Sequence, residues 1–205
     1  MKVLAINGSP REGGNTDRIL RMALEPLESA GAETEIVRIG GRNIRACTAC
    51  MLCFKNKDGR CVIDSDMLND VAGKFTGVDG IILGSPTYFA DVTPDMKAFM
   101  DRAGFVAQAN GAPLKRKAGA SVTAVRRGGA IHCLDTMNHW LHYMQTYMVG
   151  STYWNMVYGR EIGEVENDAE GAKTMRNLGE NFLVLLRLFE AGKGHCSPMP
   201  ANEKS

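Results

Sequence analysis

The sequence predicts a three-layer α/β protein, in which helices cover both faces of a five-stranded parallel sheet. Short apolar runs suited to buried strands recur along the chain, and between them lie segments whose apolar residues repeat at helical spacing. Strands and helices that alternate in this way imply parallel strands joined by helical crossovers. The sequence has no internal repeat or low-complexity linker, so its 205 residues are expected to form one domain.

Five segments have the composition of strands. Residues 2–7 are mostly apolar and stop at a glycine, which suits a buried parallel strand. Residues 33–39 alternate apolar and polar side chains like an edge strand, and residues 80–84 read Gly-Ile-Ile-Leu-Gly. The fourth and fifth strands are predicted at 117–125 and 148–152.

Five amphipathic segments are predicted to be helices. The first starts near Thr16 with Asn15 as its N-cap, and Pro26 should kink it or end it early. The third starts at Thr93, because a capping threonine followed by proline and aspartate favours a helix start. The others are expected from Asp64 or Ser65 to about Phe75, over 130–148, and over 168–191.

Composition narrows the class of protein. The formal net charge is +1, so nothing in the charge balance favours nucleic acid or an anionic membrane as a partner. The N-terminus lacks the apolar core of a secretory signal, and no apolar run is long enough and free enough of polar residues to span a membrane. We expect a cytoplasmic protein with one domain over 1–192, a cysteine-rich loop at 45–62 and a flexible C-terminal tail at 193–205.

The loop after the first predicted strand has the composition of a phosphate site. Its glycines let the backbone approach an anion, the following helix start supplies free N–H groups, and an arginine adds a full charge. Neither Gly-Lys-Ser/Thr nor Gly-x-Gly-x-x-Gly occurs here, which leaves a terminal monophosphate such as that of FMN. The alternative is a tight glycine turn that binds nothing. The candidate ligands are Ser9, Pro10, Arg11, Gly14, Asn15 and Thr16.

Two further loops follow predicted strands and should lie on the same edge of the sheet. The first offers aromatic rings that could stack on an isoalloxazine ring, and the second offers amides and guanidinium groups for the ring carbonyls. No side chain is assigned a catalytic role, because a flavin carries its own chemistry. The residues concerned are Pro86, Thr87, Tyr88 and Phe89 in the first loop and Arg126, Arg127 and Gly128 in the second.

Four of the six cysteines crowd into one short segment, at Cys47, Cys50, Cys53 and Cys61. Four thiolates are the number that a [4Fe-4S] cluster takes. Three of them in tandem, at two-residue gaps, favour iron–sulfur over the separated pairs of a zinc site. Free redox-reactive thiols and zinc remain the alternatives.

These motifs together resemble a known family. Gly-Ser-Pro-Arg at 8–11 with Asn15-Thr16, Ser-Pro-Thr-Tyr at 85–88, and the run from Lys97 to Asp101-Arg102 are similar to NADPH-dependent FMN reductases. Cys-Thr-Ala-Cys-Met-Leu-Cys at 47–53 is similar to the iron–sulfur flavoprotein branch, although the gap before the fourth cysteine is longer here. The resemblance covers about residues 1–190.

The resemblance implies a flavodoxin-like fold with strand order 2-1-3-4-5 and FMN at the edge where the loops gather. It also implies that Ser9, Arg11, Asn15 and Thr16 hold the phosphate, that residues 86–89 line the ring, and that the chain forms a homodimer or homotetramer. The charge-free face of the 130–148 helix is a candidate contact between subunits, with packing inside the subunit as the alternative.

The implied activity is that of an FMN-dependent oxidoreductase. NAD(P)H would donate electrons, and the acceptor would be a small molecule or a protein, reached through the [4Fe-4S] cluster if one is bound. Two alternatives stay open. One is an electron carrier with no substrate of its own, and the other is a quinone or azo reductase that uses flavin alone.

Overall fold

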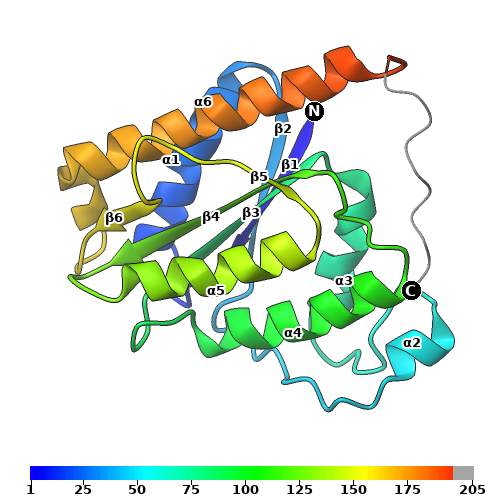
Figure 1. Cartoon of the computed structure of the whole chain (residues 1–205). Helices are drawn as coiled ribbons and strands as arrows, with labels where there is room; N and C mark the ends of the chain where they lie inside the picture. The colour runs from blue at the N-terminus through cyan, green and yellow to red at the C-terminus, as the bar shows by residue number, and fades with distance from the viewer. Residues whose placement is uncertain (196–205) are drawn as a thin grey trace.

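The computed structural model describes residues 1–195, in which one parallel sheet forms the centre of the molecule (Figure 1). The strands are hydrogen-bonded in the order β2-β1-β3-β4-β5. The sixth strand, β6, also pairs with β4: β5 pairs with the start of β4 and β6 pairs with its end. This order confirms the flavodoxin-like topology. The strands are β1 (Lys2–Asn7), β2 (Glu33–Arg38), β3 (Gly80–Pro86), β4 (Ala118–Val125), β5 (Tyr147–Met148) and β6 (Met156–Tyr158).

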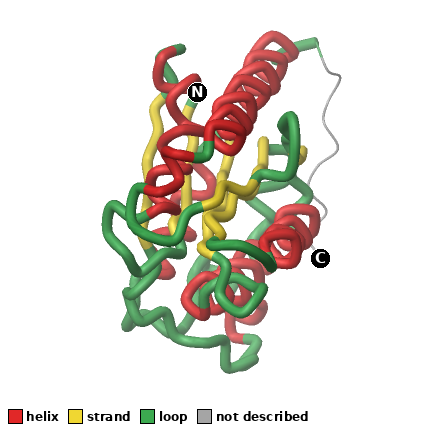
Figure 2. Tube along the Cα trace, turned by 90° about the vertical axis from the view of Figure 1, so that its left-hand side faces the viewer, coloured by secondary structure: helices red, strands yellow, loops and turns green. Residues whose placement is uncertain are grey.

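Helices cover both faces of the sheet, as Figures 1 and 2 show from two directions. On one face α1 (Asn15–Ser29) and α6 (Ala169–Gly192) pack together. On the other face lie α3 (Leu68–Gly73), α4 (Pro94–Ala109) and α5 (Ala130–Tyr143), and the short α2 (Leu52–Asn56) contacts α4. Two 3₁₀ turns, at Lys74–Gly77 and Glu164–Asn167, complete the elements.

The strands are apolar on both sides because both faces of the sheet are covered. In β1, Val3 and Ala5 belong to the core beneath α1 and α6, whereas Leu4 and Ile6 belong to the core beneath α3, α4 and α5. All four side chains are buried. A parallel sheet with two covered faces leaves only its edges for ligands, and the loops that leave the strands build any site there.

The first helix differs from its prediction at both ends. Its N-cap is Gly14, so Asn15 is the first helical residue and its side chain is free to bind a distant loop. Pro26 does not stop the helix, which continues to Ser29. At this level α6 comes very close: a Cβ on Gly179 would lie 2.2 Å from the carbonyl oxygen of Ala23 and 2.9 Å from the ring of Pro26.

The second predicted helix starts later than expected, at Leu68 rather than at Asp64 or Ser65. The reason is Asp66, whose carboxylate accepts from the N–H groups of Arg45 and Leu68 and so ties the preceding loop to the cysteine segment. The helix also ends at Gly73, before the 3₁₀ turn that contains Phe75.

The fifth strand is split, which the sequence analysis did not anticipate. α5 ends at Tyr143, and Gln145 takes a left-handed conformation with φ of 60°, which turns the chain back toward the sheet. β5 then pairs with the first residues of β4 and β6 with its last three, so a loop at 149–155 separates the two pieces. The prediction of one strand at 148–152 and of a helix to residue 148 is wrong in these respects.

Two remaining expectations concern membrane-spanning segments and the C-terminal tail. No helix within residues 1–195 is long and apolar enough to cross a membrane. α6 runs to Gly192 and the chain turns at 193–195, but residues 196–205 of the predicted tail lie outside the described part of the chain.

Candidate functional site

Loops after four strands surround one cavity at the carboxyl edge of the sheet. Its volume is about 290 Å³, and it is the place where ligands of open parallel sheets bind. The loops follow β1, β3, β4 and β6. The lining residues are Ser9, Arg11, Asn15, Thr16, Pro86, Thr87, Tyr88, Ala124, Arg126, Gly159 and Arg160.

Most of the predicted ligand residues line this cavity, and five do not. Gly14 instead caps α1, and a Cβ there would lie 2.9 Å from that of Arg11. Phe89 stands fully exposed at a loop tip with a left-handed φ of 48°. Pro10, Arg127 and Gly128 are also exposed and lie outside the lining.

The first loop is held by its own polar groups. Asn7 Oδ1 accepts from the N–H of Ser9 at 2.9 Å, and Ser9 Oγ accepts from the N–H of Arg11 at 3.2 Å. Gly40, at the end of β2, packs directly on this turn, because a Cβ there would lie 2.3 Å from the carbonyl carbon of Ser9. Contacts within the protein therefore define the shape of this loop.

Thr16 has a buried side-chain hydroxyl without a hydrogen-bond partner among the described residues. The residue is buried and lines the cavity at the start of α1. The amide nitrogen of the nearby Asn7 side chain is buried and unpartnered as well. A buried hydroxyl without a partner costs about 1–3 kcal/mol, so this one marks a position where a ligand atom fits.

The segment after β6 completes the cavity, and the sequence analysis missed it. Asn15 Nδ2 donates to the carbonyl of Glu161 at 2.9 Å, and Asn15 Oδ1 accepts from the N–H of Gly163 at 2.8 Å. Arg11 Nη1 donates to the carbonyl of Arg160 at 3.3 Å. A usable signal existed, because glycine and arginine at 159–160 follow an apolar run just as they do in the loop after β4.

The loop after β3 is tied to the first loop through the start of α4. Thr93 caps α4 by accepting from the N–H of Met96, and its hydroxyl donates to the carbonyl of Gly8 at 2.8 Å. Within the loop, Tyr88 and Asp91 exchange backbone hydrogen bonds, and the Asp91 carboxylate accepts from the hydroxyl of Thr136. The strained tip that carries Phe89 is thus anchored on both sides.

The four clustered cysteines line a second, small pocket beside α4. Cys47, Cys50, Cys53 and Cys61 surround a space of about 20 Å³, and all four are free thiols. Even so, within residues 1–195 no three metal-ligating side chains stand close enough to hold an ion as placed. As placed, the four cysteines border one pocket without forming a metal site.

The thiols differ in their surroundings. The pKa of Cys50 is lowered, first by a hydrogen bond from the N–H of Leu52. Burial raises the pKa of Cys53. Cys50 is the exposed member of the set, and the other three are half-buried.

Two larger hollows lie away from these sites. One of about 590 Å³ is at the opposite, amino-terminal edge of the sheet, between the start of β1 and the end of α6. The other, of about 460 Å³, lies between α5 and the loop at 149–155 and is bordered by Tyr153 and Trp154. The first of these hollows is bordered by Arg116, Lys117 and Lys193, but also by the carboxylates of Asp79 and Glu190. Neither hollow is lined by Asn7 or Thr16, whose side chains carry the buried unpartnered atoms of the described residues.

A model of the family described as NADPH-dependent FMN reductase matches residues 1–161. The chain belongs to this family. It is therefore a flavin oxidoreductase, and its flavodoxin-like sheet with the cavity at the carboxyl edge agrees with that membership.

Curated relatives of this FMN reductase family member carry the name iron–sulfur flavoprotein. One from Methanocaldococcus jannaschii is 32% identical over 197 residues, covering 93% of this chain and 100% of the relative. Another from Methanosarcina thermophila is 32% identical over 195 residues, covering 94% and 99%.

Solved structures share the fold at low sequence identity. RosB superimposes with a TM-score of 0.74 at 18% identity, over 93% of this chain and 81% of RosB. A WrbA-like flavodoxin from Agrobacterium tumefaciens gives 0.62 at 16% identity, over 91% and 97%.

Proposed function

We propose that this chain binds FMN at the carboxyl edge of the sheet and transfers electrons from NAD(P)H to an acceptor, with a [4Fe-4S] cluster on its four clustered cysteines. The observation that carries the proposal is the buried, unpartnered hydroxyl of Thr16, a residue that lines a cavity bordered by cationic side chains. A phosphate oxygen is the partner that this hydroxyl lacks.

The residues around Thr16 suit a phosphate dianion. Arg11, Arg126 and Arg160 border the same cavity, and the first N–H groups of α1 have no partners within their own helix. Charge-assisted hydrogen bonds from arginine to phosphate are about twice as strong as neutral ones. We assign the phosphate to Ser9, Arg11, Asn15 and Thr16, with Arg160 as an addition to the predicted set.

The neighbouring loop would hold the ring. Thr87 and Tyr88 border the cavity, Tyr88 remains partly exposed, and the main chain of this loop offers hydrogen-bond groups at the same edge. FMN held there would supply the redox chemistry, because a flavin can take up two electrons and release them singly.

The cysteine pocket suits an iron–sulfur cluster in its donor set. Four free cysteines border one pocket, and thiolate sulfur is the ligand of [4Fe-4S] clusters. Ala49 and Met51 take left-handed φ angles of 52° and 58°, so the segment between the first three cysteines is a tight, irregular loop. Binding would draw the sulfurs together by closing this loop.

One helix joins the two sites. Thr93, the N-cap of α4, bonds to the first loop. Further along α4, Arg102, Phe105 and Val106 border the cysteine pocket. Arg102 lies nine positions after Thr93, which is about 14 Å along a helix axis at 1.5 Å per residue. A flavin and a cluster would therefore sit at neighbouring points of the same helix.

Anaerobic purification followed by an absorption spectrum, iron and sulfide assays, and NADH and NADPH oxidation tests the proposal. We expect bound FMN, cluster absorption, and nicotinamide oxidation that saturates with acceptor concentration. Flavin without iron would instead indicate a reductase that uses flavin alone. Bound cofactors with transfer only to a redox partner, and no saturable acceptor, would indicate an electron carrier.

A further inference from the structure

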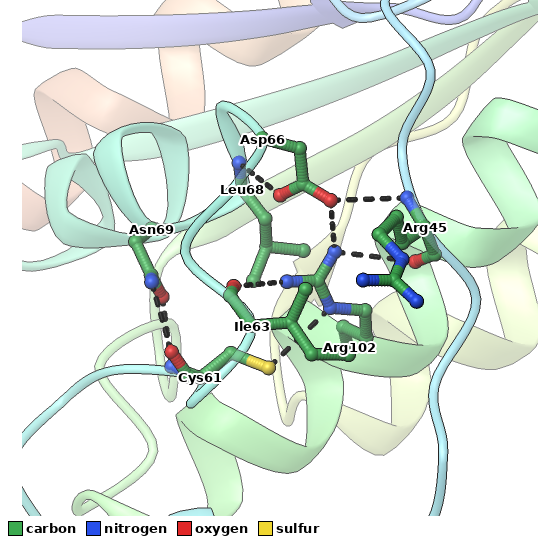
Figure 3. A network of polar contacts seen from close by, with 7 residues as sticks. All are labelled: Arg45, Cys61, Ile63, Asp66, Leu68, Asn69 and Arg102. Atoms are coloured by element: carbon green, nitrogen blue, oxygen red, sulfur yellow. Dashed lines mark hydrogen bonds and ion pairs between the residues drawn. The ribbon is translucent and has the colours of Figure 1, made fainter.

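Arg102 is a buried guanidinium that joins α4 to the cysteine segment (Figure 3). Its side chain is only 1% exposed, and all three of its nitrogens are engaged. Nη1 pairs with the carboxylate of Asp66 and donates to the carbonyl of Arg45 at 3.2 Å. Nη2 donates to the carbonyl of Ile63 at 2.6 Å, and Nε donates to the sulfur of Cys61 at 3.4 Å.

Asp66 makes this buried charge tolerable. Its side chain is 2% exposed, and besides pairing with Arg102 it accepts from the N–H of Arg45 at 3.0 Å and from that of Leu68 at 3.1 Å. A buried ion pair is stable only when further hydrogen bonds satisfy both charges, and here they do. Three parts of the chain that surround the cysteines are fastened to α4 in this way.

Cys61 is also clamped from its other side. The side chain of Asn69, in α3, accepts from the N–H of Cys61 at 2.7 Å and donates to its carbonyl at 2.9 Å. The other three cysteines differ, because in the described residues the hydrogen bonds at their sulfurs come from within the segment 47–54. Cys61 is therefore the fixed member of the set.

We propose that Arg102 is a positioning residue for Cys61. It holds the sulfur of Cys61 in place before a cluster forms. Once a cluster is bound, Arg102 donates a hydrogen bond to this sulfur and places a positive charge beside it. The proposal rests on the [4Fe-4S] cluster proposed above. Hydrogen bonds to ligand sulfurs and the local charge set the reduction potential of such clusters, so Arg102 should raise it.

The test compares two changes at the network with one matched control. Arg102→Lys keeps the charge but loses the planar fork, and an ammonium cannot reach all the acceptors at once. Arg102→Met combined with Asp66→Leu removes both charges and leaves apolar groups in their place, which buried pairs often tolerate. Lys97→Gln, at an exposed position of the same helix, breaks only the pair with Asp101.

Amide hydrogen exchange on cluster-free protein is the first measurement. We expect faster exchange at residues 60–66 in Arg102→Lys and in the double variant, with wild-type exchange in Lys97→Gln. Unchanged exchange in both network variants would overturn the anchoring role. Because no metal is present, this result does not depend on whether the chain binds a cluster.

The cluster's reduction potential, followed by electron paramagnetic resonance after reconstitution, is the second measurement. The double variant should have the most negative potential, Arg102→Lys should lie between it and wild type, and Lys97→Gln should match wild type. A wild-type potential in a fully iron-loaded double variant would overturn the proposal. Wild type that holds no iron after reconstitution would defeat the proposed cluster instead, and hydrogen exchange would then decide the role of Arg102.

Discussion

The N–H of Gly163 donates a hydrogen bond to the side chain of Asn15, although the two residues are 148 positions apart in the chain. The same Asn15 side chain also donates to Glu161, and Arg11 donates to Arg160. The first helix start and the segment after β6 therefore form one continuous wall. Because this wall borders the cavity that contains Thr16, changes on either side of it should affect FMN binding.

Arg11→Ala should weaken FMN binding by about 10- to 150-fold. A hydrogen bond to a charged group contributes about 1.5–3 kcal/mol, which corresponds to that range. Titration of apoprotein with FMN measures the effect. Arg21→Ala, which breaks an exposed pair on the same helix, should leave the affinity unchanged. Riboflavin should bind wild type weakly and be little affected by Arg11→Ala, and an unaltered FMN dissociation constant would remove Arg11 from the site.

Thr16→Val should weaken FMN binding without lowering the stability of the apoprotein. It removes a hydroxyl that has no partner in the protein, so the free energy of unfolding of apoprotein should stay the same or rise by up to about 1–3 kcal/mol. FMN affinity should fall by about 10- to 150-fold, because the phosphate loses a donor. Urea unfolding and FMN titration measure the two effects. Thr34→Val, at a hydroxyl that pairs with Glu28, serves as the control, and a large loss of apoprotein stability in Thr16→Val would contradict the assignment.

Asp66 should make stability depend on acid pH. Burial acts to raise its pKa, but hydrogen bonds from Arg102 and the N–H groups of Arg45 and Leu68 outweigh burial, and the net pKa is lowered. A lowered folded pKa gives stability that is present above the unfolded value of about 3.9 and is lost as pH falls through the folded pKa. The difference in unfolding free energy between wild type and Asp66→Asn should therefore be largest near neutral pH and shrink in acid. A difference that is constant with pH would show that Asp66 keeps its ordinary pKa.

Cys61→Ser should abolish or destabilise the [4Fe-4S] cluster while leaving FMN bound, because the two sites are separate pockets. Iron and acid-labile sulfide assays on anaerobic protein measure the cluster, and the flavin spectrum is the internal control. Cys133→Ser, at a buried cysteine outside the segment, should keep its iron. Equal iron content in Cys61→Ser and wild type would remove Cys61 from the ligand set.

We expect a homodimer or homotetramer that uses the surface around Trp154. Exposed Ile131, Tyr153 and Trp154 border the hollow beside α5, and clustered exposed apolar groups mark interaction sites. Trp154→Asp would bury an unpaired charge in a covered surface and should dissociate the oligomer. Light scattering measures the mass of both proteins. Arg176→Asp, on an exposed part of α6, is the control, and monomeric wild type at micromolar concentration would refute the expectation.

The outer face of α5 shows why the sequence could only point toward such a surface. The charge-free face of the predicted 130–148 helix consists of Asn138, His142 and Gln145. In the structure Asn138 accepts a hydrogen bond from the hydroxyl of Ser121 in β4, and Gln145 lies beyond the helix end. A helical wheel places residues by angle alone. The position of the sheet and the end of the helix decide which of them reach solvent.

Local patterns determined the layers, most element positions and the loop that carries Ser9, Arg11 and Thr16. Apolar runs of strand length, helical periodicity and capping residues act over a few positions, so a sequence reveals them. The tandem spacing of the cysteines predicts a candidate iron–sulfur site for the same reason. These features depend on neighbours in the chain.

Tertiary structure alone decided what those features meet. The split of the fifth strand, the contact of Asn15 with the segment after β6, and the grip of Arg102 on Cys61 all join residues far apart in sequence. The sequence places Arg102 in a family-like run on a predicted helix but does not show that it is buried. The packing of α4 against the cysteine segment buries it. Burial turns an ordinary arginine into a group that must satisfy every nitrogen, and that requirement fixes the fourth cysteine in place.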